Sequence, residues 1–265
     1  MNRVERLLDR GPARLNARLR LAKKAWQGDR LLPLMRRLVG PGDVVVDIGA
    51  NRGVYTVLLE RRVGRQGRVH AVDPFPDNVR MLRAATAGQT SVHAAALSDH
   101  TGVATLFVPV QDGRPIHALA TLVPPDRSGD VEYTETPVDV RRLDDLVGAE
   151  AGRVTFVKCD VEGHELPVLE GAASIIERAR PHLAVEIEQR HQRQDIREVF
   201  HRIEAWGYDG YAIFPGGLRP VAEFDVTRDQ LAFTGEGFVP YGMPDGYVGD
   251  FLFVRAGTPV EGLLG

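Results

Sequence analysis

Residues 44–53, Val-Val-Val-Asp-Ile-Gly-Ala-Asn-Arg-Gly, decide the fold. The first five form an almost continuous apolar run, which is typical of a strand buried on both faces of a parallel sheet. The glycines that follow allow a sharp backbone turn and a close approach to a ligand. Because a helix is expected over residues 53–62, the stretch indicates a strand, a glycine loop and a helix, the first unit of an α/β fold.

The same alternation continues along the chain and predicts a parallel, doubly wound sheet with right-handed crossovers. Two further strands, at 103–108 and 136–140, are expected to form an excursion from it, and the Gly- and Pro-rich segment 215–249 is expected to be a loop excursion. The strands of the main sheet are expected at 44–48, 68–73, 91–97, 153–160, 182–188 and 250–255, and its helices at 53–62, 77–87, 165–178 and 192–206.

The composition is that of a globular protein: of 265 residues, 43% are hydrophobic and 26% charged, which excludes a disordered or collagen-like chain. The single cysteine, Cys159, excludes an intramolecular disulfide. No apolar run reaches the ~20 residues that cross a bilayer, and the first 30 residues lack the apolar block of a secretory signal. We therefore expect a cytoplasmic protein without a membrane partner.

Charge is unevenly distributed, because the first 37 residues hold eleven Arg or Lys and only three acids. Apolar residues at helical spacing predict an N-terminal helical extension over residues 1–40, ahead of a main domain at 41–265. No aromatic residues interleave with these charges, so a nucleic-acid partner is not expected, and assembly into a homo-oligomer is left open. The spaced apolar residues are Val4, Leu7, Leu8, Leu15, Leu19, Leu31, Leu34, Met35 and Leu38.

The glycine loop and the next acid favour one kind of ligand. A dinucleotide-binding loop would bind a pyrophosphate at this place. Here the loop carries Asp47 instead, and a carboxylate suits a cationic amino-acid group. Asp73 ends the second predicted strand, 20 residues after Gly53, where an acid can accept both hydroxyls of a ribose. Together they indicate S-adenosylmethionine. The structural alternatives are a tight turn at the loop and a helix cap ahead of Pro74.

Five stretches together make the chain resemble the FkbM-type class I S-adenosylmethionine-dependent methyltransferases. The resemblance covers about residues 43–188 and implies a Rossmann-like sheet of seven strands and methyl transfer, usually to oxygen. The main domain would then be the S-adenosylmethionine-binding methyltransferase domain. The stretches are residues 45–56, Ala-Leu-Ser-Asp at 96–99, Arg-Leu-Asp-Asp-Leu at 142–146, Phe-Val-Lys-Cys-Asp-Val-Glu-Gly-His-Glu at 156–165 and Leu-Glu-Gly-Ala at 169–172.

The resemblance also implies the cofactor contacts. Residues 47–53 would cradle the methionine part, Asp73 the ribose, and residues 96–98 the adenine edge. The family more often has Glu in place of Asp73. The side chain of Asp is one methylene shorter, so it reaches both ribose hydroxyls less readily. The full set of expected contacts is Asp47, Gly49, Ala50, Asn51, Gly53, Tyr55, Thr56, Asp73, Pro74, Ala96, Leu97, Ser98 and Asp160.

The acids at the ends of two later strands are candidate catalytic groups. Asp160 and Glu186 are expected to face one cavity, because ligands bind at the carboxyl ends of the strands. Methyl transfer to an alcohol needs a base within hydrogen-bond reach, and we expect it to be Asp160, His164 or Glu186, in that order. Alternatively, Asp160 holds the cofactor's amino group, His164 caps a helix and Glu186 pairs with Lys158. Glu162 and His191 are expected in the flanking loops.

Mg²⁺ is a possible further cofactor, because two acidic strand ends can supply the one or two carboxylates that it needs. A zinc site is not expected, since Cys159 stands alone and the eight histidines show no ligand spacing.

The leading hypothesis is O-methylation of a hydroxyl on a small-molecule acceptor, a sugar or a secondary metabolite of natural product biosynthesis. The alternatives are an RNA or protein methyltransferase that uses the basic N-terminal helices, a nicotinamide-dependent oxidoreductase, and a non-catalytic nucleoside-binding module.

Overall fold

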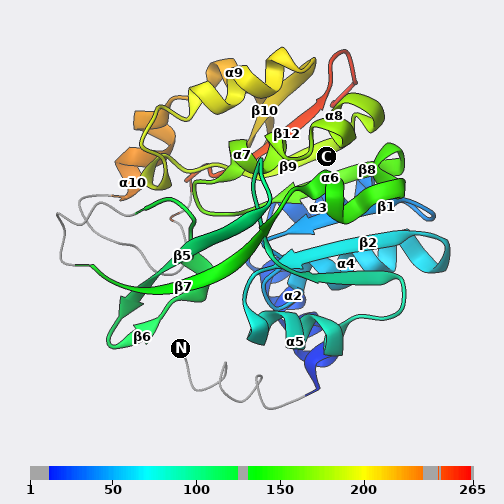
Figure 1. Ribbon diagram of the computed structural model, residues 1–265. Coiled ribbons are helices and arrows are strands. Elements are labelled where there is room, and N and C mark those ends of the chain that lie inside the picture. Colours follow the sequence, from blue (N-terminus) through cyan, green and yellow to red (C-terminus); the bar gives the residue numbers. More distant parts are fainter. Residues whose placement is uncertain (1–11, 125–130, 235–243, 245, 264–265) are drawn as a thin grey trace.

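The computed structural model describes residues 12–124, 131–234, 244 and 246–263. Within them, a large sheet lies between two layers of helices (Figure 1). Its strands are β1 (Val44–Ile48), β2 (Arg68–Asp73), β3 (Thr90–Ala94), β8 (Val154–Cys159), β9 (His182–Glu186), β10 (Tyr208–Phe214), β11 (Gly217–Pro220) and β12 (Asp250–Arg255). They stand in the order β11-β10-β12-β9-β8-β1-β2-β3, so the α/β prediction is confirmed.

Each face of the sheet has its own helices. One face is covered by α2 (Ala13–Trp26), α3 (Leu31–Leu38), α4 (Val54–Val63) and α5 (Pro76–Ala85), and the other by α6 (Leu143–Val147), α7 (Glu165–Glu170), α8 (Ala173–Ala179) and α9 (Arg197–Ala205). In β1, Val45 packs into the first layer, while Val44, Val46 and Ile48 pack into the second. This two-sided burial explains the continuous apolar run of the first strand.

The strand order reverses between β1 and β8. From β1 the chain passes outward through β2 to β3, and it then returns to β8 on the other side of β1 and continues to β9, all in parallel. Ligands of open α/β sheets bind at such a switch point, outside the carboxyl ends of the strands. In Figure 1 the arrowheads of β1 and β2 mark this edge.

The far end of the sheet corrects the expectation of an all-parallel sheet. Strand β12 runs antiparallel to both of its neighbours, β9 and β10. Strand β10 was missed because its buried positions include Gly210 and Ala212, whose small side chains hide the alternation. With β11, the described sheet has eight strands, not seven.

The predicted loop excursion at 215–249 is also corrected. Its described part contains β11, a 3₁₀ turn at Val221–Glu223, a π-helical turn at Thr227–Leu231 and the short helix α10 (Ala232–Thr234). Buried residues in this segment, among them Val221 and Phe224, pack against the second helical layer. Residues 235–243 and 245 lie outside the described part of the chain.

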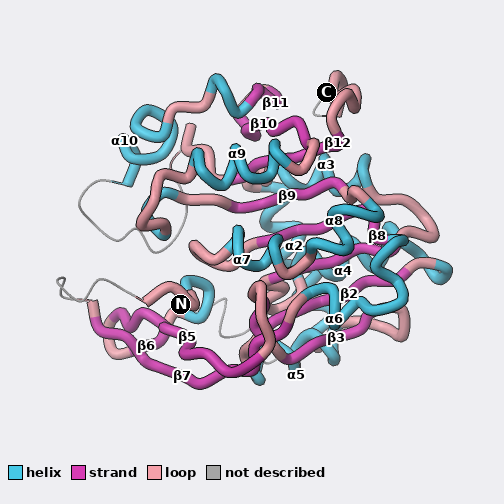
Figure 2. Tube along the Cα trace, turned by 45° about the horizontal axis from the view of Figure 1, so that its top comes forward, coloured by secondary structure: helices cyan, strands magenta, loops and turns pink. Residues whose placement is uncertain are grey.

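A second, small sheet projects beyond the carboxyl edge of the first (Figure 1, Figure 2). The two predicted excursion strands are confirmed as its antiparallel pair β5 and β7. The strand expected at 91–97 divides, because its first part is β3 and its last two residues join the small sheet as β4. The small sheet has the order β4-β7-β5-β6, with β4 (Ala96–Leu97), β5 (Gly102–Gln111), β6 (Arg114–Pro115) and β7 (Glu132–Arg141).

Two predicted helices also differ from the structure. The helix expected at 165–178 breaks into α7 and α8 at Gly171, where an added Cβ would lie 2.1 Å from the carbonyl oxygen of Ser98. Asp144 accepts hydrogen bonds from Ser174 N (2.9 Å) and Ile175 N (3.0 Å). These bonds satisfy two backbone amides in the first turn of α8 and so stabilise its beginning. The helix expected at 192–206 begins only at Arg197, after a 3₁₀ turn at 189–191.

The described part of the N-terminal extension packs onto the sheet through α2 and α3. Leu34 and Met35 are fully buried there, while Leu15 and Leu19 remain exposed. Three of the predicted apolar positions, Val4, Leu7 and Leu8, lie outside the described residues. None of the helices in the described ranges has the length and apolar character that crossing a membrane requires.

Candidate active site

The glycine loop lies at the switch point and touches the end of β8. Gly49 has a φ of +69°, and a Cβ there would lie 1.9 Å from the carbonyl oxygen of Asp160, so only glycine fits. The amides of Gly49 and Ala50 both donate to the carbonyl of Val72, at 3.1 and 3.0 Å. Gly53, at a φ of +80°, begins α4. The loop is therefore held tightly between β2 and β8.

Asp47 is fully buried at the end of β1 with one oxygen unsatisfied. Its Oδ2 accepts a hydrogen bond from Thr56 Oγ1 at 2.6 Å, whereas its Oδ1 has no partner among the described residues. Burial raises the pKa of Asp47, and the charge of Lys158 counteracts the rise. Thr56 is buried as well, and its hydrogen bond fixes the position of Asp47.

Asp73 lies at the end of β2 and is almost surrounded by donors. Its carboxylate accepts hydrogen bonds from the amides of Asn51 (2.8 Å) and Phe75 (2.9 Å) and from Asn78 Nδ2 (3.0 Å). Only 4% of the residue is exposed, and burial raises its pKa to about 6. Asp73 thus ties the glycine loop to the loop after β2, and Pro74 lies between Asp73 and its partner Phe75 in that second loop.

The residues expected at the adenine edge lie where the small sheet meets the large one. Ala96, Leu97 and Ser98 are all buried, and Leu97 belongs to the main hydrophobic core. Ser98 Oγ lies 2.9 Å from His164 Nε2. The histidine therefore contacts Ser98 and does not act as a side-chain helix cap. The contact places His164 beside Ser98, and its role as a catalytic base stays a prediction.

Tyr55 connects the site to the N-terminal extension. Its hydroxyl donates to Asp29 Oδ2 at 2.7 Å and accepts from Lys24 Nζ at 2.8 Å. The ammonium of Lys158 lies over the Tyr55 ring, 5.2 Å from its centroid. Segment 24–30 is therefore fixed beside the carboxyl edge of the sheet, and Tyr55 is already engaged by this chain.

Asp160 and Lys158 form a close pair at the end of β8. Lys158 Nζ lies 3.0 Å from Asp160 Oδ2, and Lys158 is almost completely buried. Burial lowers the pKa of Lys158, but Asp160, Asp47 and Glu186 together raise it above its ordinary value. Since an ammonium already neutralises Asp160, the structure offers no support for Mg²⁺ between Asp160 and Glu186.

Glu186 lies at the end of β9, opposite Asp250 at the start of β12. Burial raises the pKa of Glu186 well above its ordinary value, and the charges of Asp160 and Asp250 raise it further. Burial is also the main cause that raises the pKa of Asp250 to about 6. The predicted grouping of Asp160 with Glu186 is therefore consistent with the structure, which adds Asp250 to it.

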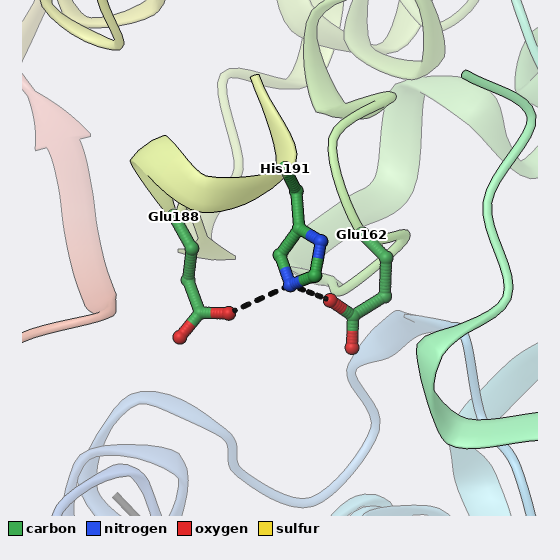
Figure 3. Close-up of side chains that lie close together, drawn as sticks. All are labelled: Glu162, Glu188 and His191. Carbon is green, nitrogen blue, oxygen red and sulfur yellow. Dashed lines mark ion pairs between the residues drawn. The ribbon is translucent and has the colours of Figure 1, made fainter. Parts of the chain in front are cut away.

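A third group lies in the loops that follow β8 and β9 (Figure 3). His191 Nε2 is 2.8 Å from Glu162 Oε2 and 3.2 Å from Glu188 Oε2. Burial lowers the pKa of His191, but the two carboxylates outweigh it and raise the pKa to about 9. The sequence placed Glu162 and His191 in flanking loops without a role and missed Glu188. A usable signal was the repeated acid-x-acid spacing, at 160 and 162 and again at 186 and 188.

Comparison with family models finds a match over residues 47–209, more than half of the chain, to the "Methyltransferase FkbM domain". The matched range contains both the glycine loop and the ends of β8 and β9. A search of curated proteins finds no significant match.

Among solved structures, an FkbM methyltransferase from Methylobacillus flagellatus KT is 19% identical, with a TM-score of 0.48. The match covers 80% of this chain and 43% of that one, so this chain spans less than half of that protein's length. The O-methyltransferase TomG of Streptomyces achromogenes, involved in tomaymycin synthesis and solved in complex with S-adenosylmethionine, is 14% identical (91% and 90% covered, TM-score 0.46). A precorrin-6y C5,15-methyltransferase from Geobacter metallireducens GS-15 is 11% identical (86% and 89% covered, TM-score 0.44). At these scores, family membership rests on the family model alone.

Proposed function

The chain belongs to the FkbM methyltransferase family, and from this we propose that it transfers the methyl group of S-adenosylmethionine to a hydroxyl oxygen of a small molecule. The observation that supports it most is the free oxygen of Asp47. A buried carboxylate oxygen without a donor is costly, and here it lies in the glycine loop at the switch point, where the ammonium of the cofactor's methionine part would satisfy it.

The remaining residues fit the same cofactor. Gly49 brings the glycine loop against the end of β8, because a side chain there would meet the carbonyl oxygen of Asp160. Asp73 would take the ribose and residues 96–98 the adenine edge. A carboxylate accepts about four hydrogen bonds, and Asp73 already accepts three, so it has room for one ribose hydroxyl and not for two. When bound, S-adenosylmethionine supplies an electrophilic methyl group on a sulfur that leaves easily.

The protein must then align the acceptor and remove its proton. We assign proton removal to Glu186, because burial raises its pKa well above that of an ordinary carboxylate and its ionised form is a correspondingly stronger base. Asp160 is less suited, since its Oδ2 already lies 3.0 Å from the ammonium of Lys158. Its role would be to position the acceptor or the cofactor.

The charge of the site favours a small acceptor over RNA. Asp160, Glu162, Glu186, Glu188 and Asp250 all belong to this edge of the sheet, and such a surplus of acids repels phosphates. The nicotinamide alternative is disfavoured in the same way, since Asp47 lies where a pyrophosphate would have to bind.

Methyl transfer can be tested with S-adenosylmethionine labelled in its methyl group and three acceptor pools: hydroxyl-bearing small molecules, total protein and total RNA. We expect label in the small-molecule pool, in a product that resists mild acid as an ether does. Label in RNA or protein alone would contradict the proposal, as would transfer to amines but not to alcohols.

A further inference from the structure

The structure holds a group of side chains that methyl transfer, as proposed, does not use. Glu162, Glu188 and His191 each offer one ligand atom, and the three atoms lie within 4.8 Å of one another. The two distances from His191 Nε2, 2.8 and 3.2 Å, match the spacing of about 3 Å between neighbouring ligand atoms around an ion with bonds of about 2.1 Å.

The orientation of His191 is set between its two neighbouring carboxylates. Its Nε2 is buried, yet it forms no well-aligned hydrogen bond, although both carboxylate oxygens are close. Figure 3 shows the two dashed lines diverging on either side of this nitrogen. The ring nitrogen is therefore directed between the oxygens and not at either one, which is the direction along which it would bind a cation shared with them.

A second buried group faces the same place. Tyr247 is only 6% exposed, and its hydroxyl is turned towards Glu188. Among the described residues, that hydroxyl has no well-formed hydrogen bond either. His191 and Tyr247 thus both approach the Glu188 carboxylate without a well-aligned hydrogen bond to it.

The two loops that carry these ligands are locked together. Glu165 is buried and accepts hydrogen bonds from Gly163 N (2.8 Å) and Gln192 Nε2 (2.7 Å). Gly163 has a φ of +97°, and a Cβ there would lie 2.3 Å from the carbonyl oxygen of His191. The loop after β8 is thereby held against the turn after β9, so Glu162 and His191 have fixed relative positions without a ligand.

We propose that Glu162, Glu188 and His191 form a binding site for a divalent transition-metal ion beyond the carboxyl ends of β8 and β9. One imidazole and two carboxylates suit ions from Mn²⁺ to Zn²⁺ better than Mg²⁺, which prefers oxygen ligands alone. Arg190 donates to Glu188 Oε2 from Nε (2.8 Å) and NH2 (2.6 Å), and ligating carboxylates are commonly oriented by such an outer hydrogen bond.

The test is a titration of the full chain, stripped of metal with a chelator and dialysed. Co²⁺ is followed by its visible absorption and Mn²⁺ by calorimetry. We expect one ion per chain, with a Kd of about 100 μM or tighter, and at least tenfold weaker binding for Glu162→Gln and for His191→Asn. Glu198→Gln and His201→Asn, exposed positions on α9, are the matched controls and should bind as the unchanged protein does.

Absence of saturable binding to the folded protein would overturn the proposal, and so would equal binding by all four variants. If a variant fails to fold, nuclear magnetic resonance of the unchanged chain decides. Mn²⁺ should broaden the ring signals of His191 before those of the other seven histidines, and no such preference would contradict the site. Methyl transfer is not measured, so failure here leaves the proposed transferase activity untouched.

Discussion

Asp73 gives a pH dependence to the proposed cofactor binding. Its pKa is raised to about 6, mainly by burial, and a ribose hydroxyl donates best to the ionised carboxylate. Protonation below pH 6 therefore removes the acceptor, and we expect the affinity for S-adenosylhomocysteine to fall about tenfold from pH 7 to pH 5. Calorimetry at several pH values measures it. The control Asp73→Asn should bind weakly, with little change over the same range, and a steep pH dependence in that variant would rule Asp73 out.

Glu186 and Asp160 can be separated by kinetics. We expect Glu186→Gln to lower kcat by roughly 10²-fold or more while the Kd for S-adenosylhomocysteine changes less than about threefold, because a base acts only in the chemical step. Asp160→Asn should lower kcat less than Glu186→Gln does, and it should weaken the binding of S-adenosylhomocysteine instead. Initial rates at saturating cofactor, paired with calorimetry, decide the matter. If the two variants exchange these effects, Asp160 is the base.

Individual site residues could be predicted only where their place in the chain is distinctive. Asp47 and Asp73 follow strands that the apolar pattern reveals, so their positions at the strand ends were foreseen. The three donors around Asp73 and the contact between His164 and Ser98 could not be predicted, because both depend on how loops distant in the sequence pack against one another. Sequence spacing does not give such distances.

At the scale of elements, the cap of α8 can be tested directly. Asp144, on α6, accepts from two backbone amides in the first turn of α8, as an N-cap side chain would, and losing such a cap costs about 1 kcal/mol. We expect Asp144→Ala to lower the free energy of unfolding by roughly that amount, and Asp144→Asn by less. The neighbouring Asp145 is exposed, so Asp145→Ala is the matched control and should change little. Urea unfolding followed by circular dichroism measures all three, and equal effects at both positions would contradict the cap.

Elements with strong periodicity were predicted well, and those shaped by close packing were not. The run at β1 and the pair β5 and β7 follow from apolar patterns. The break between α7 and α8 follows from the approach of Gly171 to the Ser98 backbone, which no local pattern announces. Strand β10 was hidden by its small buried residues, and the antiparallel direction of β12 is not marked by any pattern in its own residues.

For the whole molecule, the basic N-terminal extension is expected not to bind nucleic acid. In its described part, Arg14 pairs with Glu60 (2.7 Å), Lys24 pairs with Asp29 (3.1 Å), and Arg30 donates to backbone carbonyls of the sheet's far end. We therefore expect no RNA retardation in a mobility-shift assay at physiological salt. Retardation that weakens steeply as salt is raised would contradict this, because it is the signature of phosphate contacts.

The most direct measurement of the central claim is calorimetric titration of the unchanged chain and Asp47→Asn with S-adenosylhomocysteine and, separately, NADH. The unchanged chain should bind one S-adenosylhomocysteine and no NADH. Asp47→Asn should bind at least about tenfold more weakly, because the free oxygen of Asp47 is expected to hold the cofactor's ammonium through a charge-assisted hydrogen bond. Absence of S-adenosylhomocysteine binding by the folded protein, or equal affinity in the variant, would contradict the account.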